Sequence, residues 1–292
     1  VPQLLLGGAM IKFDELHRSM SRKIYVPLVG DIMVTRWAYE AISVEQFRSN
    51  KFEKPFFWYD MEISQNEWYA SFLLPTLKSK INEALIDGKK PDLTNYTVRN
   101  LKKIRYHIND LSSITRIKAG EWINKMTYDD FNEFTAGEAQ SFLDSLSAVF
   151  RASNRYLTHR HDSLYQQISS RMGEEEFIEM KGKNYNEHLA DIVLNNLTTS
   201  KIYDAGDRYI QKADPVFMHP GSRTGRSHFF APYKQIGDLK MSTLLFNVVV
   251  IWIMVITLLV TLYYSVLKRF IAFLESLKLP ILRKYGRDLL QI

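Results

Sequence analysis

The side chains best suited to hold a metal ion stand together at His159, His161 and Asp162, with further histidines at His107 and His188. Imidazole and carboxylate groups are common ligands of zinc. On a helix each residue is turned by about 100° from the one before it, so His159 and His161 point to different sides and do not converge as an i, i+4 pair would. The spacing therefore favours a solvated polar helix face over a metal site.

No short motif for phosphate binding or nucleophilic catalysis occurs in the sequence. The Gly182-Lys183 pair lacks both the earlier glycine and the following hydroxyl residue of a P-loop. There is no Gly-x-Ser-x-Gly elbow, His-Glu-x-x-His helix or Gly-x-Gly-x-x-Gly turn. The absence of cysteine excludes disulfides, thiol nucleophiles and iron–sulfur clusters. The sequence thus offers no catalytic, cofactor-binding or metal-binding residue.

A patch of basic and aromatic residues lies at Arg223, Arg226, His228, Phe229 and Phe230. Such residues bind nucleic acids, and they also meet lipid headgroups beside a membrane span. The patch precedes a long apolar segment by about fifteen residues, which favours lipid over nucleic acid as its partner. The residues that we expect at the membrane interface are Arg223, Arg226, Phe229 and Phe230, together with Tyr263 and Tyr264 at the far end of the apolar segment.

That apolar segment, 244–264, is 21 residues long and carries no charge, with Asn247 as its one amide. A helix of this length spans about 32 Å, enough to cross a bilayer core of about 30 Å. A buried helix of a soluble protein is the alternative, but such helices are usually shorter and carry polar breaks. We therefore predict a membrane span and, as a partner, the lipid bilayer.

The residues after the span indicate its orientation. The 28-residue tail, 265–292, holds six Lys or Arg and two Asp or Glu, and an excess of Lys and Arg marks the cytoplasmic side of a span. We expect this tail to be a basic amphipathic helix in the cytoplasm and the long segment before the span to lie outside.

The whole-chain averages alone suggest an ordinary folded protein. The 292 residues include 38 Lys and Arg against 32 Asp and Glu, a net charge of +6, and 46% are hydrophobic, with a mean hydropathy of −0.20. These values exclude a disordered chain, collagen and a bundle wholly within the membrane. The length allows one large domain or two smaller ones.

The chain begins with an apolar run, 1–12, that is too short to span a bilayer and lacks the basic start of a signal peptide. We interpret it as the end of a transmembrane helix whose beginning is missing, although a buried strand at an unusual mature N-terminus would also fit. The next segment, 13–50, contains an amphipathic stretch from Val34 to Phe47 with Asp31 and Thr35 as possible caps. Its position suits an interfacial or re-entrant helix.

The middle of the chain has strong helical signals. Capping-box patterns begin at Ser64 and Thr135, and a stripe of apolar residues at steps of three and four runs from Val98 to Ile117. No hairpin signal of the Asn-Gly type occurs. We therefore expect a mainly α fold: a helical extracytoplasmic globule of four to six mostly antiparallel helices, between a truncated and a full transmembrane helix. The expected segments are 1–12, 13–50, the globule 51–211, a connector rich in Pro, Gly and aromatic residues 212–243, the span 244–264 and the tail 265–292.

The order of motifs resembles a known family. Pro2-Gln3 and Gly7-Gly8 are followed by Phe13-Asp14, by RWAYEA at 36–41 and by Phe47. This order looks like the end of the fifth transmembrane helix and the next outer loop of ABC-2 type permeases, especially the ABCG-like group. The resemblance covers residues 1–50 in their motifs, whereas residues 241–267 match only in their position and apolar character. The insert 51–240 is much longer than is usual there, and is similar to that of large bacterial, Bacteroidetes-type ABC proteins with ATPase and permease in one chain.

The resemblance implies a role in ATP-driven transport. Members of this family are half-transporters, so a second permease half and a nucleotide-binding domain, in the same chain or on a partner, would complete the machine. ATP and Mg would bind that missing ATPase domain, with no cofactor in this fragment. The chain would lie in the bacterial inner membrane with its globule in the periplasm. The implied gate and structural residues are Gly7, Gly8, Arg36, Trp37, Tyr39, Glu40 and Phe47.

Two other classes of protein remain open from the sequence. One is a membrane-anchored helical sensor, assembly or interaction protein without transport activity. The other is a soluble helical enzyme with one anchor, which would require a convergent polar pocket on the globule. Within the transporter interpretation, Arg36 and Glu40 stand at i and i+4 on the expected helix and would pair with each other.

Overall fold

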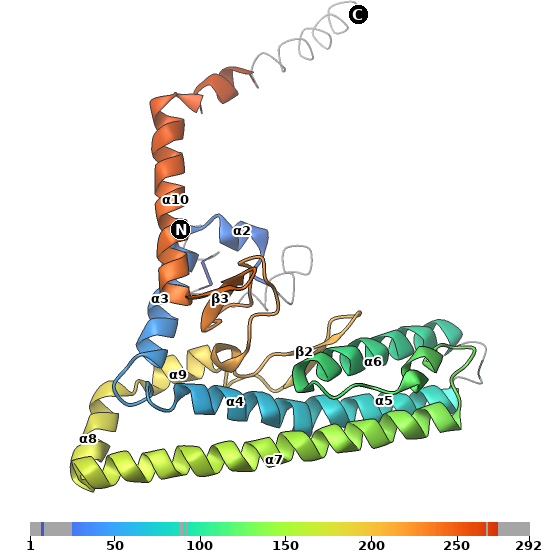
Figure 1. Cartoon of the computed structure of the whole chain (residues 1–292). Coiled ribbons are helices and arrows are strands. Elements are labelled where there is room, and N and C mark those ends of the chain that lie inside the picture. The colour runs from blue at the N-terminus through green and yellow to red at the C-terminus, as the bar shows by residue number, and fades with distance from the viewer. Residues whose placement is uncertain (1–6, 9–24, 88–89, 91–92, 267, 274–292) are drawn as a thin grey trace, which may run out of the picture.

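The structure is a computed structural model that describes residues 7–8, 25–87, 90, 93–266 and 268–273. In these residues the chain is mainly helical, as predicted (Figure 1). Most of the apolar run 1–12 and the tail beyond residue 273 lie outside the described residues. The helices form a long arm, from which one apolar helix rises at a steep angle.

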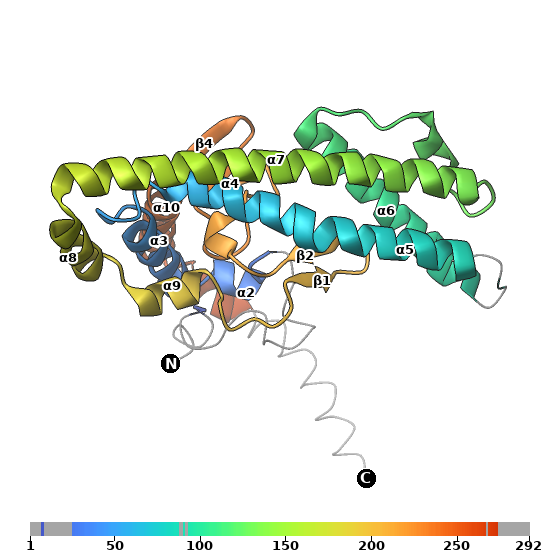
Figure 2. The same ribbon diagram turned by 90° about the horizontal axis from the view of Figure 1, so that it is seen from below.

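Two long helical rods lie side by side in the arm (Figure 2). One is α7, whose 40 residues extend about 60 Å at 1.5 Å per residue. The other runs from Phe57 to Asp87 through α4, a π-helical turn and α5 without a break. The helices of the arm are α4 (Phe57–Trp68), η2 (Tyr69–Leu73), α5 (Leu74–Asp87), α6 (Thr94–Thr115), η4 (Glu121–Lys125) and α7 (Glu133–Met172).

The core of the arm forms where the apolar stripes of α5, α6 and α7 meet. Side chains three and four positions apart lie on one face of a helix, so the stripe predicted along α6 packs its apolar residues inward. Buried members of this core include Leu77, Ile81, Ile104, Ile108 and Leu143. Asn132 caps α7 by accepting a hydrogen bond from the Thr135 backbone at 3.0 Å, as N-terminal capping residues do.

The chain turns back toward the apolar helix after α7. Gly173, with φ +96°, takes a left-handed conformation that favours glycine, and leads into α8 (Glu174–Asn184) and α9 (Glu187–Val193). α9 packs against α3 (Val34–Arg48), where Val44, Phe47 and Val193 share a buried cluster. This cluster joins the helical arm to the helices beside the predicted span.

Two short antiparallel hairpins were not predicted: the first departs from the expected helical globule, and the second lies within the connector. β1 (Ile202–Asp204) pairs with β2 (Tyr209–Gln211), and β3 (Tyr233–Ile236) pairs with β4 (Leu239–Ser242). Their turns contain Gly206 at φ +97° and Gly237 at φ +57°, so glycine supplies the left-handed positions without an Asn-Gly signal. The first hairpin is held to the arm by a hydrogen bond of 2.8 Å from the Tyr209 backbone to His107 Nε2.

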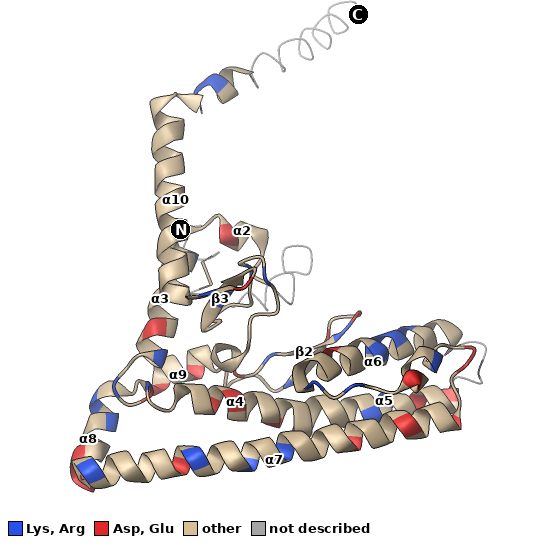
Figure 3. Ribbon diagram, in the orientation of Figure 1, with Lys and Arg blue, Asp and Glu red and all other residues tan. Residues whose placement is uncertain are grey.

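The apolar helix α10 (Thr243–Tyr263) is long and apolar enough to cross a membrane, and no other helix in the described part of the chain passes that test. Figure 3 shows it free of charged residues. Its side chains are mostly exposed, and only Thr243 and Asn247 are buried. α3 packs along the first part of α10, and the short α2 (Leu28–Asp31) lies beside the start of α3. The predicted span and the predicted amphipathic helix are therefore neighbours.

Candidate functional site

A network of buried charges lies where α3, the connector and α10 meet. Arg36 and Glu40 stand one helical turn apart on α3, with 2% and 0% of their side chains exposed, and Lys234 of β3 is 1% exposed. Taking a charged group out of water costs several kcal/mol per ion. Such residues persist in a fold only when opposite charges and hydrogen bonds surround them.

Glu40 is the centre of this network. Lys234 Nζ donates to Glu40 Oε1 at 2.6 Å, and Asn247 Nδ2 donates to Glu40 Oε2 at 2.9 Å. Arg36 Nη1 lies 3.3 Å from the same Oε2. Burial alone would raise the pKa of Glu40, but the charges of Arg36 and Lys234 and the hydrogen bonds from Lys234 and Asn247 hold it below its ordinary value. The carboxylate therefore stays ionised at neutral pH.

Lys234 links the connector to α3. Its ammonium group also donates to Ser227 Oγ, so two segments of the connector converge on Glu40. Burial lowers the pKa of Lys234 to about 8, against the opposing effect of Glu40. The lysine thus remains mainly charged at pH 7, and the Glu40–Lys234 contact is an ion pair.

Asn247 brings α10 into the network. It lies in the second turn of α10 and is fully buried. Besides its bond to Glu40, its Nδ2 donates to the backbone oxygen of Trp37 at 3.0 Å. The one amide of α10 therefore makes a specific contact with α3.

A second carboxylate, Asp31 at the end of α2, extends the network to that helix. Asp31 Oδ1 lies 3.7 Å from Arg36 Nη2, and Asp31 Oδ2 accepts from Arg226 Nη2 at 3.2 Å. Arg226 also donates to the backbone oxygen of Val26 at 2.9 Å. Burial raises the pKa of Asp31, while Arg36 and Arg226 oppose that shift. Three basic residues thus surround two carboxylates.

Aromatic rings cover this network. The guanidinium carbon of Arg36 lies 3.8 Å from the ring centre of Trp37, a cation–π contact, and Trp37 packs on Phe246 of α10 with 6.2 Å between ring centres. Tyr39 lies 6.2 Å from Phe229 and 5.9 Å from Phe230 between ring centres. These rings keep water from the charges, which strengthens the ion pairs.

The structure brings together most of the residues that the sequence singled out. Arg36, Trp37, Tyr39 and Glu40 lie in the network or its aromatic cover, with Arg226, Phe229 and Phe230 from the connector. Phe47 lies apart, in the cluster that joins α3 to the arm, where its ring is 5.9 Å from that of Phe217. We expected the basic and aromatic patch to meet lipid headgroups, because it lies close to the apolar segment. Two of its members, Arg226 and Phe230, contact protein in the structure.

The remaining predicted residues lie outside the network. Gly7 and Gly8 form a turn in which Gly8 has φ +79°. Arg223 is exposed and lies 3.5 Å from Asp238. Tyr263 and Tyr264 stand at the opposite end of α10, exposed, with their rings 5.0 Å apart. Their exposure is compatible with an interfacial position.

Sequence reasoning missed the partners that complete the network. Lys234 and Ser227 were not singled out, because nothing in the local pattern relates them to Glu40. Asp31 was considered only as a possible cap of α3, although it pairs with Arg36 and Arg226. Asn247 gave the clearest sequence signal of the network, because a single amide in an uncharged apolar segment needs a hydrogen-bond partner.

The network connects four segments of the chain. It joins α2, α3, the connector and α10 through ion pairs and hydrogen bonds, among them the contact of Lys234 with the Ser227 hydroxyl. Around the histidines considered first, His161 lies 3.4 Å from Asp60, and the described residues contain no group of three His, Asp or Glu side chains placed to hold a metal ion. Comparison of the chain with models of known protein families, with curated proteins and with solved structures gives no match.

Proposed function

We propose that this chain is part of the membrane portion of an ATP-driven transporter of the ABC-2 type. The observation that carries the proposal is the Glu40-centred network, in which Asn247 of the apolar helix and Lys234 of the connector hold one carboxylate of α3. Movement of α10 would therefore be transmitted to α3 and, through the connector, to the helical arm. The network makes these segments a coupled unit.

A passive anchor would have no need of this network. Buried ion pairs contribute little net stability compared with apolar packing, yet breaking one by removing a partner is costly. Their best-attested use is to specify one arrangement over others. Arg36 Nε and Asn247 Oδ1 are buried and lack a hydrogen-bond partner among the described residues. Such spare bonding capacity suits a network that exchanges partners between two conformations.

In the proposed topology α10 crosses the bacterial inner membrane, the helical arm lies in the periplasm and the C-terminus lies in the cytoplasm. The exposed apolar surface of α10 supports contact with lipid and with a second permease half, since apolar side chains without protein cover need an apolar environment. A nucleotide-binding domain, fused or on a partner, would bind ATP and Mg and supply the energy.

The proposed gate residues fall into two groups. Arg36, Trp37, Tyr39 and Glu40 act at the α3–α10 contact, where the network and its aromatic cover lie. Phe47 acts at the contact of α3 with the helical arm. The Gly7-Gly8 turn would permit close helix approach near the outer face, as small residues do in membrane proteins.

Purification from native membranes tests the proposal. The chain should be recovered, as a larger polypeptide or a stable complex, with a domain that hydrolyses ATP in the presence of Mg. Hydrolysis should stop when Mg is chelated, because the metal neutralises the phosphate charge. Recovery of the chain without any ATP-hydrolysing domain would overturn the proposal and favour a membrane-anchored sensor, assembly or interaction protein.

A further inference from the structure

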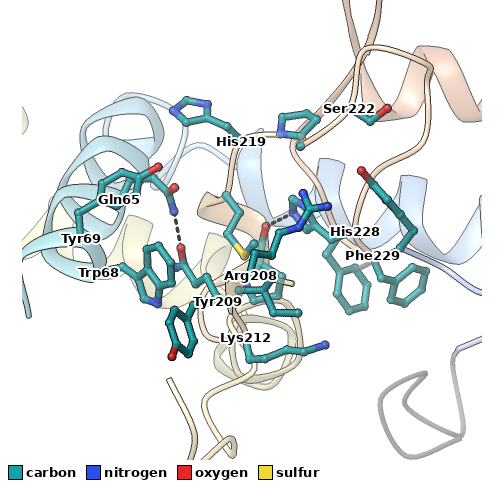
Figure 4. A pocket seen from close by; sticks show the side chains of 18 of the residues that line it. Gln65, Trp68, Tyr69, Arg208, Tyr209, Lys212, His219, Ser222, His228 and Phe229 are labelled. Carbon is teal, nitrogen blue, oxygen red and sulfur yellow. Dashed lines mark hydrogen bonds between the residues drawn. The ribbon is translucent and has the colours of Figure 1, made fainter. Parts of the chain in front are cut away.

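A cavity of about 970 Å³ lies between the helical arm and the connector, and polar groups around it are matched with one another. Figure 4 shows Gln65 and His228 in its lining, and each makes a hydrogen bond to another lining residue. Two of its basic side chains have acidic neighbours: Arg208 beside Asp207, and Arg223 beside Asp238. The titratable groups where α7 meets α8 are arranged differently, because two acidic side chains contact each other there.

The elbow of the molecule is the place where the end of α7, α8 and the turn between α3 and α4 (residues 49–56) pack together. Figure 1 shows α8 bent away from the end of α7. Three buried rings form the core of the elbow: Phe52 and Phe56 from the turn, and Phe177 from α8. No side chain of α7 after Phe150 is buried, so partly exposed contacts attach the later half of α7 to the rest of the molecule.

Glu53 and Asp60 are the two acidic side chains that meet in the elbow. Glu53 lies in the turn and is 5% exposed, and its carboxyl group is hydrogen-bonded to that of Asp60 in the first turn of α4. Two ionised carboxylates only accept hydrogen bonds and repel each other, so this contact requires a proton on one of them. Burial and the neighbouring Asp60 raise the pKa of Glu53 from 4.5 to about 8. Glu53 therefore holds the proton at pH 7.

Asp60 carries the contact on to α7. Its Oδ1 lies 3.4 Å from His161 Nε2, and the other ring nitrogen of His161 lies 3.2 Å from Asp162 Oδ1. The His161 ring packs on Phe56 with 5.0 Å between ring centres. The row of Glu53, Asp60 and His161 thus links the α3–α4 turn, α4 and the later half of α7.

The other charged groups near this row leave the two carboxyl groups short of cations. Lys181 of α8 opposes the rise in the pKa of Glu53, and its ammonium lies 5.2 Å from the centre of the Phe52 ring. Burial raises the pKa of Tyr185, so its hydroxyl is neutral at pH 7. The remaining charged groups are Glu187 and Asp191 of α9, which act on Tyr185, and Lys51 and Lys54, which are exposed on the turn itself.

We propose that the elbow is a pH-sensitive clasp, closed while Glu53 and Asp60 share a proton and loosened when alkali removes it. In the closed state Glu53 donates to Asp60, and Asp60 pairs with His161. Removal of the proton leaves two negative charges side by side in a largely buried site, and separation of α7 and α8 from the turn admits water to them. The clasp lies apart from the Glu40-centred network, so it does not depend on the proposed transporter function.

The direction of the pH effect follows from the proton count. The pKa of Glu53 is about 8 in the folded chain, against an ordinary value of 4.5. Between these values the closed elbow binds more protons than the open one, so the free energy of opening falls as the pH rises. The clasp is therefore tight in mild acid and weak in alkali.

Hydrogen exchange of the full chain in lipid nanodiscs tests the clasp. In the unmodified chain the protection of α8 and of the later half of α7, corrected for intrinsic exchange rates, should fall at least about tenfold between about pH 6 and about pH 9. In Glu53→Gln the amide cannot ionise but still donates to Asp60, so protection should stay constant over this range. Glu67→Gln removes an exposed carboxylate from α4 and should keep the full pH dependence.

The same pH dependence in Glu53→Gln and in the unmodified chain would overturn the clasp. If Glu53→Gln fails to fold, infrared spectra of the unmodified chain decide the matter, because a protonated carboxyl group has a C=O band that a carboxylate lacks. Such a band at pH 7 that fades as the pH rises through about 8 supports the shared proton. A chain without this band at pH 7 contradicts it.

Discussion

Lys234 and Glu40 are 194 positions apart in the chain, and their side chains meet at 2.6 Å with almost no exposure to solvent. The contact joins β3 to α3 at the place where Asn247 of α10 also reaches the same carboxylate. An ion pair that closes so long a loop fixes how the connector lies against α3 and α10.

Removal of Glu40 should destabilise the fold strongly. In Glu40→Ala, Arg36 and Lys234 remain buried without their shared carboxylate, and the loss of one partner of a buried pair costs about 3–5 kcal/mol. Glu45→Ala is the matched control on the same helix, since Glu45 pairs with Arg48 in a partly exposed bridge worth under about 1 kcal/mol. Thermal unfolding in detergent measures the stability lost in each variant. Equal losses of stability in Glu40→Ala and Glu45→Ala would contradict the network.

Lys234→Met should cost less than Glu40→Ala. Glu40 then keeps Arg36 and Asn247 as partners, so no buried charge is left unpaired. In the double variant Glu40→Ala/Lys234→Met the loss of stability should be smaller than the sum of the two single losses. Lys234→Met then removes the ammonium group that Glu40→Ala leaves unpaired. Strict additivity in a double-mutant cycle would show that the two residues do not interact.

Acid should weaken the attachment of the β1–β2 hairpin to the arm. His107 is buried and accepts a hydrogen bond from the Tyr209 backbone, and burial lowers its pKa from 6.5 to about 4. Between those values the unfolded state binds more protons than the folded state, so the free energy of unfolding falls as pH drops from 6.5 toward 4. The contribution is about 1–3 kcal/mol. His107→Gln should show a shallower fall in unfolding temperature with acid, and parallel curves would contradict the assignment.

Asn247→Leu should loosen α10 from α3 although it makes the span more apolar. The variant loses the hydrogen bonds to Glu40 and to the Trp37 backbone and leaves Glu40 Oε2 with its ion pair to Arg36 but without a hydrogen bond, at a cost of about 1–3 kcal/mol. Thr257→Val is the control, because Thr257 bonds only within α10 to Ile253. The unfolding temperature should fall for Asn247→Leu and not for Thr257→Val. A rise for Asn247→Leu would show that the amide does not hold α10 against α3.

The proposed topology has a direct test because the chain contains no cysteine. Single cysteines at Ala148 on α7 and at Lys268 after α10 occupy exposed positions on either side of the apolar helix. A membrane-impermeant maleimide should label Ala148→Cys in spheroplasts and Lys268→Cys only after lysis. The reverse pattern, or labelling of both in intact spheroplasts, would refute the orientation.

Local patterns predicted the positions of α3 and α10 well but not how distant segments meet. The capping-box predictions at Ser64 and Thr135 were wrong, since Ser64 lies inside α4 and Asn132 caps α7. The uncharged run identified α10 almost to the residue, and the Val34–Phe47 stretch identified α3, because both signals are periodic and local. The Arg36–Glu40 contact followed from their i, i+4 spacing. The contact between Lys234 and Glu40 could not be predicted, because residues 194 positions apart show no relation in the local sequence pattern.

The hairpins and α7 show two further limits. Neither hairpin has an Asn-Gly turn, and glycine at Gly206 and Gly237 provides the required left-handed conformations in its place. In α7 the apolar stripe is interrupted by Ser153 and Arg160, yet the helix is continuous for 40 residues. The later turns of α7 contain few buried side chains and pack beside α4 and α8. This part of the helix therefore does not require a continuous apolar stripe.

If Glu40 couples α10 to the rest of an ATP-driven transporter, as proposed, ATP hydrolysis by the complete complex in proteoliposomes depends on the charge of Glu40. Glu40→Gln keeps the shape of the side chain but removes its charge, whereas Glu45→Gln alters a partly exposed glutamate of the same helix. With both variants folded at the assay temperature, we expect hydrolysis to fall about tenfold for Glu40→Gln and to stay unchanged for Glu45→Gln. Hydrolysis by Glu40→Gln at the rate of the unmodified complex would contradict the claim.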